Sequence, residues 1–167
     1  MTAVVGVVQL VGSGVYDRMC RAPEQIRDGE WWRLGSAMFF QDGGAVGLAF
    51  NLVGLVVFGV IAERVLGRWR WLVVYFGCGL FGQAMSFWWL ESTGAGNSMC
   101  VAGLIGALTA VAFVAPQRFG PRRPARPVRP VLYVAPVLAV VDTLLRDNHG
   151  LPLLLGLALG FLVRFRD

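Results

Sequence analysis

Residues 94–106 read Gly-Ala-Gly-Asn-Ser-Met-Cys-Val-Ala-Gly-Leu-Ile-Gly, a glycine-rich loop that runs directly into an apolar helix. Ser98 stands in the first turn of this helix. The only histidine of the chain, His149, opens another apolar helix further along. We expect the two helices to lie side by side in a membrane, with Ser98 and His149 brought together at their outer ends.

The composition is that of a membrane protein. Of 167 residues, 56% are hydrophobic and only 15% are charged, which is too little polar surface for an ordinary soluble domain. The apolar runs are continuous rather than alternating, so they predict helices and not the strands of a membrane barrel. We therefore expect an all-α fold, a polytopic membrane helical bundle that forms one domain over residues 1–167.

Six apolar runs predict six transmembrane helices, at residues 2–15, 44–61, 71–90, 98–115, 131–145 and 150–163. The first is short, at about 21 Å as a helix against a hydrocarbon core of about 30 Å. It is either a tilted helix or the tail of a span that starts upstream. A mixed-charge loop over residues 17–43 separates it from the second span, and a charged turn over residues 62–70 follows that span.

The arginines of the short loops set the expected orientation. Three lie in the turn at residues 62–70, five in the proline-rich linker at 116–130 and two in the tail, against none at 91–97 and one at 146–149. The positive-inside rule then places both termini in the cytoplasm and Ser98 and His149 near the outer surface of the cell membrane. The net charge of +5 therefore reflects topology, and we expect no nucleic-acid partner because no basic face is present.

Small residues predict that the two helices approach closely. Glycines and other small residues let membrane helices pack backbone to backbone. They recur every four residues in the first helix and again in the second, at Ser98, Ala102, Gly106 and Ala110, and at Gly156 and Gly160. His149 lies seven residues before Gly156, on the same helical face. A neighbouring imidazole can take the proton of a serine hydroxyl, which activates it as a nucleophile.

Each of these residues also has a structural interpretation. Ser98 is equally a helix N-cap, and His149 a wet residue at the membrane surface. Asn51 and Gln83 are typical of hydrogen bonds between membrane helices. Cys100 is an alternative nucleophile, although two positions along a helix it points away from Ser98. The three cysteines predict neither a disulfide framework nor a metal site.

Taken together, these motifs resemble the rhomboid family of intramembrane serine proteases. The likeness runs over about residues 29–160. The matching stretches are Glu30-Trp31-Trp32-Arg33, Asn51, Gly59-Val60-Ile61-Ala62-Glu63, Gly67-Arg68-Trp69-Arg70, Gly96-Asn97-Ser98, Gly103 and Gly106, and His149 with Gly156 and Gly160. The resemblance implies a six-helix bundle, a Ser98–His149 dyad without a required acid, no cofactor and no metal. It also implies cleavage of other proteins' transmembrane segments near the outer membrane surface.

The same resemblance implies the roles of the remaining site residues. Asn51 and the backbone N–H of Ser98 would form the oxyanion hole, and the run ending at Gly96 would leave room for the substrate backbone. Four positions depart from the family pattern, namely Gly47, Met99, Ala102 and Pro152. Since Gly47 replaces a usual histidine donor, the Asn97 amide is a candidate substitute.

Two other functions stay open at this point. The four departures favour a non-catalytic relative that binds transmembrane helices in the same groove. A small transporter would use Asp142, Gln83 and Asn51 as its polar path, although the chain lacks internal repeats. The substrate and the oligomeric state are not indicated by the sequence.

Overall fold

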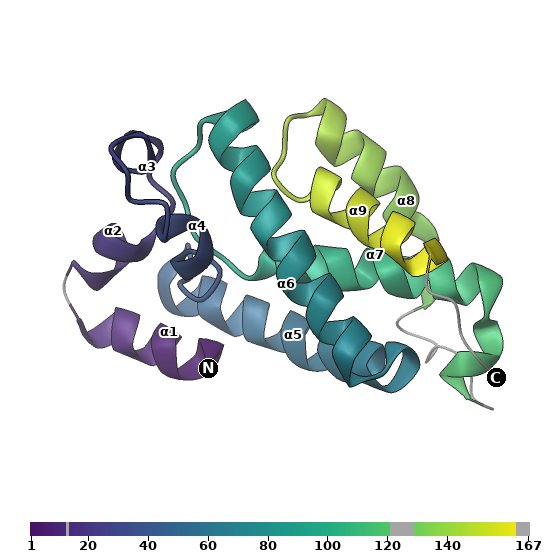
Figure 1. The fold of residues 1–167 in the computed structure, drawn as a ribbon. Coiled ribbons are helices and arrows are strands. Elements are labelled where there is room, and N and C mark those ends of the chain that lie inside the picture. Colours follow the sequence, from purple (N-terminus) through teal and green to yellow (C-terminus); the bar gives the residue numbers. More distant parts are fainter. Residues whose placement is uncertain (13, 121–128, 163–167) are drawn as a thin grey trace.

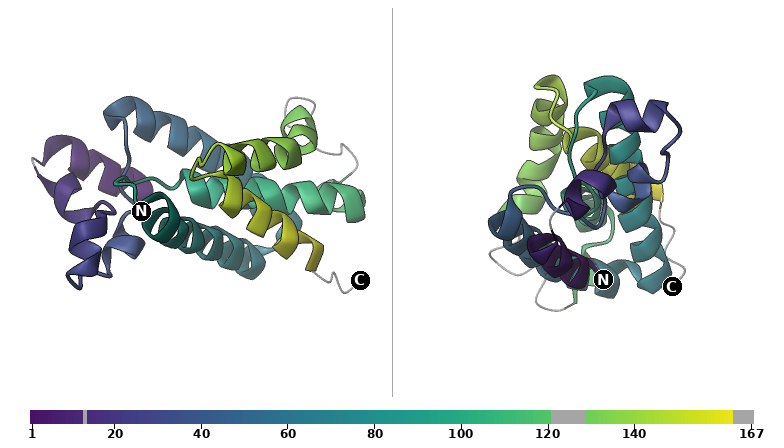
Figure 2. Two further views of the ribbon diagram at one scale, coloured as in Figure 1. Left: turned by 90° about the horizontal axis from the view of Figure 1, so that it is seen from above. Right: turned by 90° about the vertical axis from the view of Figure 1, so that its left-hand side faces the viewer.

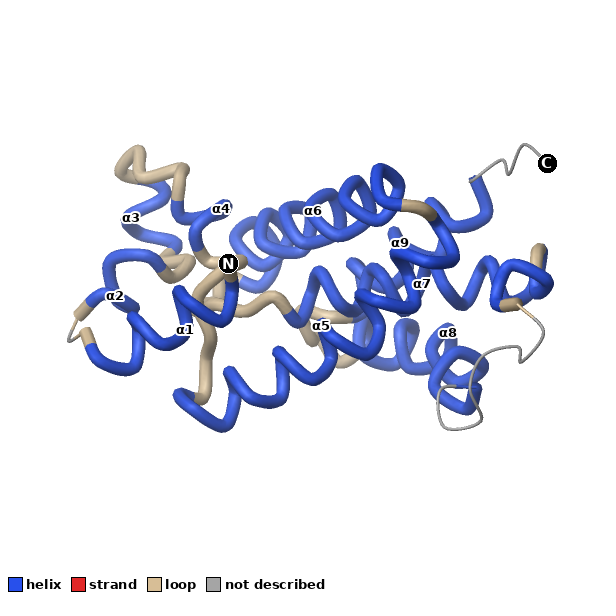
Figure 3. The backbone as a smooth tube through the Cα atoms, turned by 90° about the horizontal axis from the view of Figure 1, so that it is seen from below, coloured by secondary structure: helices blue, strands red, loops and turns tan. Residues whose placement is uncertain are grey.

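A computed structural model describes residues 1–12, 14–120 and 129–162, and helices dominate them (Figures 1 and 3). No strand occurs within these ranges, apart from one isolated bridge between Arg21 and Gly94. The expected all-α class is therefore confirmed. The elements are α1 (Thr2–Val11), α2 (Val15–Met19), α3 (Pro23–Arg27), α4 (Arg33–Ser36), α5 (Gly44–Leu66), α6 (Arg68–Met85), the π-helical turn η1 (Ser86–Leu90), α7 (Ser98–Val114), the 3₁₀ turn η2 (Pro116–Phe119), α8 (Arg129–Leu144) and α9 (Gly150–Leu162).

The expected first span over residues 2–15 is wrong as one helix. Helix α1 ends at Val11, and α2 starts separately at Val15. Gly12 follows α1 with an extended backbone, and Gly14 precedes α2 with a left-handed backbone of φ 75°, a conformation that glycine adopts at little cost. The loop expected at residues 17–43 is also more ordered than predicted, because it contains α3, α4 and most of α2.

The charged turn expected at residues 62–70 is wrong as well. Helix α5 continues to Leu66, and α6 begins at Arg68. Glu63 and Arg64 are good helix formers, so charge alone does not end the helix there. Only Gly67, with φ of 82°, interrupts the helical conformation between α5 and α6. The linker arginines at 122–126 and those at 164 and 166 lie outside the described residues.

Helix α7 is the centre of the bundle. It contacts α5, α6, α8 and α9, and most of its residues are buried. The short helices α2, α3 and α4 gather at one end of the bundle, beside the loop that leads into α7 (Figures 1 and 2). The first turn of α7 therefore lies near these short helices.

The packing of α7 on α9 depends on glycines. A Cβ at Gly156 would stand 2.8 Å from the Gly103 Cα, and one at Gly160 would stand 2.6 Å from the Ala107 carbonyl oxygen. On the α7 side of the same contact, a Cβ at Gly106 would stand 2.7 Å from the Leu157 nitrogen of α9. Real side chains do not fit at such distances, so these glycines allow direct backbone contact, as their spacing predicts.

Helix α8 contains a proline that the bundle accommodates. Pro136 has no N–H, so it cannot donate the helical hydrogen bond to the Leu132 carbonyl four residues earlier. The Thr109 hydroxyl of α7 lies 3.0 Å from that carbonyl and 2.8 Å from the Ile105 carbonyl of its own helix, and its single proton is shared between the two acceptors. A neighbouring helix thereby offers a donor to the acceptor that the proline frees, as is common among membrane helices.

Among the residues that the structure describes, two helical stretches are long and apolar enough to cross a membrane, Gly44–Leu66 and Arg68–Leu90. Thr2–Val11, Ser98–Val114 and Gly150–Leu162 are apolar but shorter. The 17 residues of α7 extend only about 25 Å. The count of six spans therefore stays a prediction.

Candidate active site

Ser98 and His149 meet between the starts of α7 and α9. The Ser98 Oγ lies 2.8 Å from the His149 Nε2, which is an ordinary hydrogen-bond distance. Ser98 is the first residue of α7, and His149 directly precedes α9. Since the glycines bring the two helices into backbone contact, residues far apart in sequence reach one another. This is the arrangement that a serine nucleophile and its general base require.

A cavity of about 300 Å³ opens beside this pair. Its polar side chains are those of Ser98, His149 and Asn51, and the rest of its lining comes from Phe50, Gly54, Val101, Ala102, Ile105 and Leu153. The cavity thus has apolar walls from α5, α7 and α9 with a few converging polar groups, as ligand sites usually do.

Asn51 is held by a buried glutamine. The Asn51 Nδ2 donates to the Gln41 Oε1 at 2.5 Å. The backbone N–H of Gln41 donates to the Gln9 side chain at 2.8 Å, and its carbonyl accepts from the same amide at 2.6 Å. Gln9 and Gln41 thereby fix the position of Asn51 on the cavity wall, a role that no sequence pattern indicated for either.

Gly96 and Asn97 precede the serine and differ in what they contact. A Cβ at Gly96 would stand 3.2 Å from the Ser98 Oγ, so a side chain there would crowd the hydroxyl. The Asn97 side chain is fully buried and donates to the Tyr75 hydroxyl at 3.3 Å. It does not line the cavity. Its role as an oxyanion donor therefore stays a prediction.

The segment of residues 17–43 holds the loop before Ser98 through backbone hydrogen bonds. Arg21 and Gly94 exchange two of them, at 2.9 and 3.0 Å. The Gly96 N–H donates to the Ala37 carbonyl at 2.9 Å, and the Asp42 N–H donates to the Ala95 carbonyl at 3.1 Å. The Asp42 carboxylate accepts from the Ala95 N–H at 3.1 Å. The glycine-rich loop is consequently not free to move independently.

Two side chains add to this support. The Arg21 guanidinium is buried and donates to the Ser92 carbonyl at 2.8 Å and to the Gln83 side chain. Burial lowers the pKa of Arg21, and the nearby Asp42 opposes this change. The Tyr16 hydroxyl donates to the Asp42 carboxylate. Burial raises the pKa of Tyr16, and the hydrogen bond to Asp42 raises it further.

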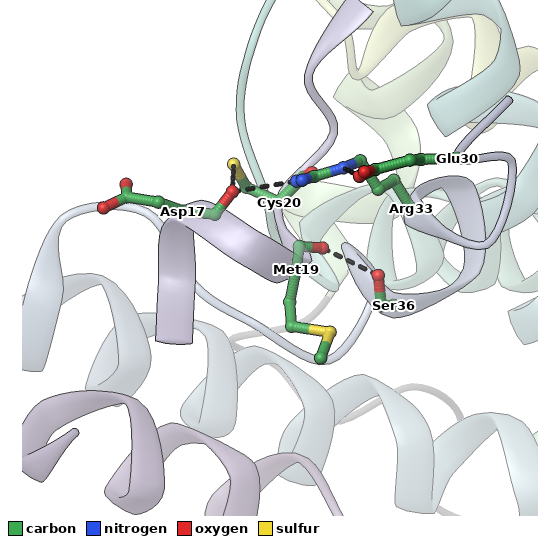
Figure 4. Close-up of polar contacts among 6 residues, drawn as sticks. All are labelled: Asp17, Met19, Cys20, Glu30, Arg33 and Ser36. Carbon is green, nitrogen blue, oxygen red and sulfur yellow. Dashed lines mark hydrogen bonds and ion pairs between the residues drawn. The ribbon is translucent and has the colours of Figure 1, made fainter. Parts of the chain in front are cut away.

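Arg33 organises the segment internally (Figure 4). Its guanidinium pairs with Glu30 at 2.5 Å and donates to the carbonyls of Asp17 and Cys20 at 2.8 and 3.1 Å. The Ser36 hydroxyl donates to the Met19 carbonyl at 2.7 Å. The Glu30–Arg33 motif therefore ties α4 to α2, at a distance from the cavity.

The surrounding structure accommodates the residues found at positions 47, 99 and 152, where the sequence departs from the family pattern. A Cβ at Gly47 would overlap the Asp42 carbonyl, so this backbone excludes a histidine there. Met99 and Pro152 are both buried against Gly82 of α6, where a Cβ would stand 3.0 Å from the Met99 Cβ and 2.7 Å from the Pro152 Cγ. Gly82 thus provides the space that these two larger residues occupy. Ala102 lines the cavity.

Asp147 lies next to the histidine and was not among the predicted residues. Its Oδ1 lies 2.6 Å from the His149 Nδ1 and accepts the backbone N–H of the same residue at 2.9 Å. A carboxylate two residues before the only histidine was the available signal. Cys100, the alternative nucleophile, is completely buried away from the cavity.

Comparison with known proteins gives consistent matches. Residues 28–166 match the Rhomboid domain. Over 87 residues the chain is 39% identical to Rhomboid protease GluP of Bacillus subtilis, covering 52% of this chain and 17% of that protein. It is 34% identical over 83 residues to Putative rhomboid protease YdcA of the same organism, covering 48% of this chain and 41% of that protein. It is 34% identical over 61 residues to Rhomboid protease AarA of Providencia stuartii, covering 36% of this chain and 21% of that protein.

The chain spans less than half the length of each of these curated relatives. No solved structure matches it.

Proposed function

Since this chain belongs to the rhomboid family, we propose that it is an intramembrane serine endopeptidase with Ser98 as nucleophile and His149 as base. The observation that carries the proposal is the 2.8 Å hydrogen bond between the two side chains, beside a cavity with apolar walls. The names of the three relatives, all rhomboid proteases, support the same reaction class.

The proposed reaction is acyl transfer. The neutral His149 Nε2 takes the proton of Ser98 as Oγ attacks the scissile carbonyl, and imidazolium then returns a proton to the leaving amine. Water hydrolyses the acyl-enzyme by the same route in reverse. These two side chains supply both the nucleophile and the proton transfers, so the proposed reaction uses no cofactor and no metal.

We assign the oxyanion to Asn51 and the start of α7. The Ser98 N–H belongs to the first turn, where no helical carbonyl lies four residues earlier to accept it. The Asn51 amide of α5 lines the same cavity and would exchange its Gln41 partner for the oxyanion. Gly96 leaves room for the substrate backbone beside Ser98, and Asn97 remains a candidate additional donor.

The proposed setting is the cell membrane, with residues 1–167 as one domain of six spans and both termini in the cytoplasm. The arginine distribution of the loops supports this orientation. The proposed substrates are transmembrane segments of other proteins, cut near the outer surface. A non-catalytic helix-binding relative is less well supported, because binding alone requires no hydrogen bond between Ser98 and His149.

A serine-directed fluorophosphonate tests the proposal on purified protein in detergent. Wild type should be labelled, whereas Ser98→Ala should not. Ser36→Ala is the matched control, because that hydroxyl donates to the Met19 carbonyl, and it should label normally. Cleavage of a fluorescent transmembrane peptide in liposomes should follow the same pattern. A folded wild-type protein that neither labels nor cleaves would refute the proposal.

A further inference from the structure

The turn between α8 and α9 holds a carboxylate against the nitrogen of His149 that does not face Ser98. The Asp147 Oδ1 lies 2.6 Å from Nδ1, and the Ser98 Oγ lies 2.8 Å from Nε2 on the other side of the ring. The imidazole is therefore contacted at both nitrogens. From this geometry we infer that Asp147 is a positioning residue, which fixes the tautomer and orientation of His149.

The chemistry of the two partners assigns the ring protons. An ionised carboxylate only accepts hydrogen bonds, so the contact with Asp147 requires the proton on Nδ1. Nε2 then carries a lone pair and can accept the Ser98 hydroxyl proton. The opposite tautomer would place N–H groups against Ser98 and leave Nδ1 bare beside a negative charge. Asp147 therefore selects the tautomer in which His149 can act as a base.

The turn itself is held in place by its neighbours. The Asp147 N–H donates to the Asp142 carbonyl at 2.7 Å. The Arg146 guanidinium donates to the Trp89 carbonyl at 2.9 Å and lies over the Trp89 ring. Because η1 and α8 both anchor the turn, the carboxylate stays within reach of Nδ1 and does not depend on a substrate for its position.

A purely local role for Asp147 must be distinguished from this one. Its Oδ1 also accepts the His149 backbone N–H at 2.9 Å, a contact that by itself makes an Asx turn before a helix. An Asx turn explains the backbone contact and requires nothing of the ring. The two roles differ in whether changing Asp147 alters the protonation of the imidazole.

Because the chain has one histidine, ¹⁵N-histidine labelling gives an unambiguous NMR spectrum of the site. At a pH where the ring is neutral, wild type should carry its proton on Nδ1. Asp147→Ala should move most of it to Nε2 and slow fluorophosphonate labelling by at least about tenfold. Asp147→Asn keeps a neutral acceptor, so it should retain the turn and most of the Nδ1 proton and should label faster than Asp147→Ala. Asp142→Asn, the control, should change neither.

The inference rests on the proposed function, and the two fail in different ways. Absence of labelling in wild type would reject the protease, whatever the tautomer. A wild-type imidazole spectrum in Asp147→Ala, or an Nε2-protonated ring in wild type, would overturn the role of Asp147 even if labelling were rapid. Labelling of Asp147→Ala at the wild-type rate would also overturn the inference, because the tautomer and orientation of the ring would then not affect the reaction.

Discussion

Replacing Gly156 by alanine should separate α7 from α9 and weaken the active site as well as the fold. The new Cβ would stand 2.7 Å from the Gly103 carbonyl carbon and 2.8 Å from its Cα. All the atoms it meets are backbone, so no side chain can rotate away. The Gly103 carbonyl oxygen would lie closer still, so the helices must separate by more than the roughly 0.7 Å that brings the 2.7 Å carbon contact to an ordinary 3.4 Å.

The expected loss of stability follows from two opposing effects. Overpacking of this kind costs about 1–3 kcal/mol, and alanine recovers up to about 1 kcal/mol through its higher helix propensity. The net change should be a loss of about 1–2 kcal/mol in the free energy of unfolding. The shift would also lengthen the Ser98–His149 hydrogen bond beyond its 2.8 Å. Labelling should slow by at least about tenfold, since misplacement by 1 Å can cost about 10²-fold.

Unfolding in a titration with a denaturing detergent measures the first effect, and fluorophosphonate labelling the second. Gly77→Ala is the matched control, because Gly77 also lies within a helix and a Cβ there would meet no atom within 4 Å. It should unfold at the same or a higher detergent fraction and label normally. If Gly156→Ala behaves like Gly77→Ala in both assays, the reasoning from close backbone contact is wrong.

Two further predictions concern the support of the serine loop and the oxyanion. Arg21→Met should lower the free energy of unfolding by about 1–3 kcal/mol, because it leaves the buried Gln83 acceptor without its guanidinium partner. Arg27→Gln, which breaks an exposed ion pair with Glu91, should change the free energy of unfolding by less than about 1 kcal/mol. If both variants lower the thermal stability equally, buried Arg21 does not stabilise the loop before Ser98 in the way described. Asn51→Ala should slow labelling about 10²-fold and lower the free energy of unfolding by about 1–3 kcal/mol, because the buried Gln41 acceptor loses its donor. An unchanged labelling rate would remove Asn51 from the oxyanion hole.

The sequence predicted the helices of the site better than those at the amino-terminal end. Ser98 and Gly150 begin helices as expected, because glycine-rich or polar turns precede long apolar runs at both places. The end of α1 was missed because residues 12–14 resemble the small-residue interruptions that membrane helices tolerate. The extension of α5 to Leu66 does not follow from the sequence, because charged residues after an apolar run are typical of the end of a membrane span.

The contacts that complete the site could not be derived from local patterns. Arg21 and Asp42 hold the loop before Ser98 through pairings distant in sequence, and no periodicity marks them. Asp147 lies only two residues before His149 in sequence, but only the fold of the turn decides whether its carboxylate reaches Nδ1. Spacing can place a residue on a face of a helix, whereas such contacts depend on how separate elements meet.

The meeting of Met99 and Pro152 at Gly82 links three helices at one point. Met99 follows the serine directly, and Pro152 lies in the first turn after His149. Both rest on the same small patch of α6. A displacement of α6 would therefore move Met99 and Pro152, the immediate neighbours of Ser98 and His149, in the same direction.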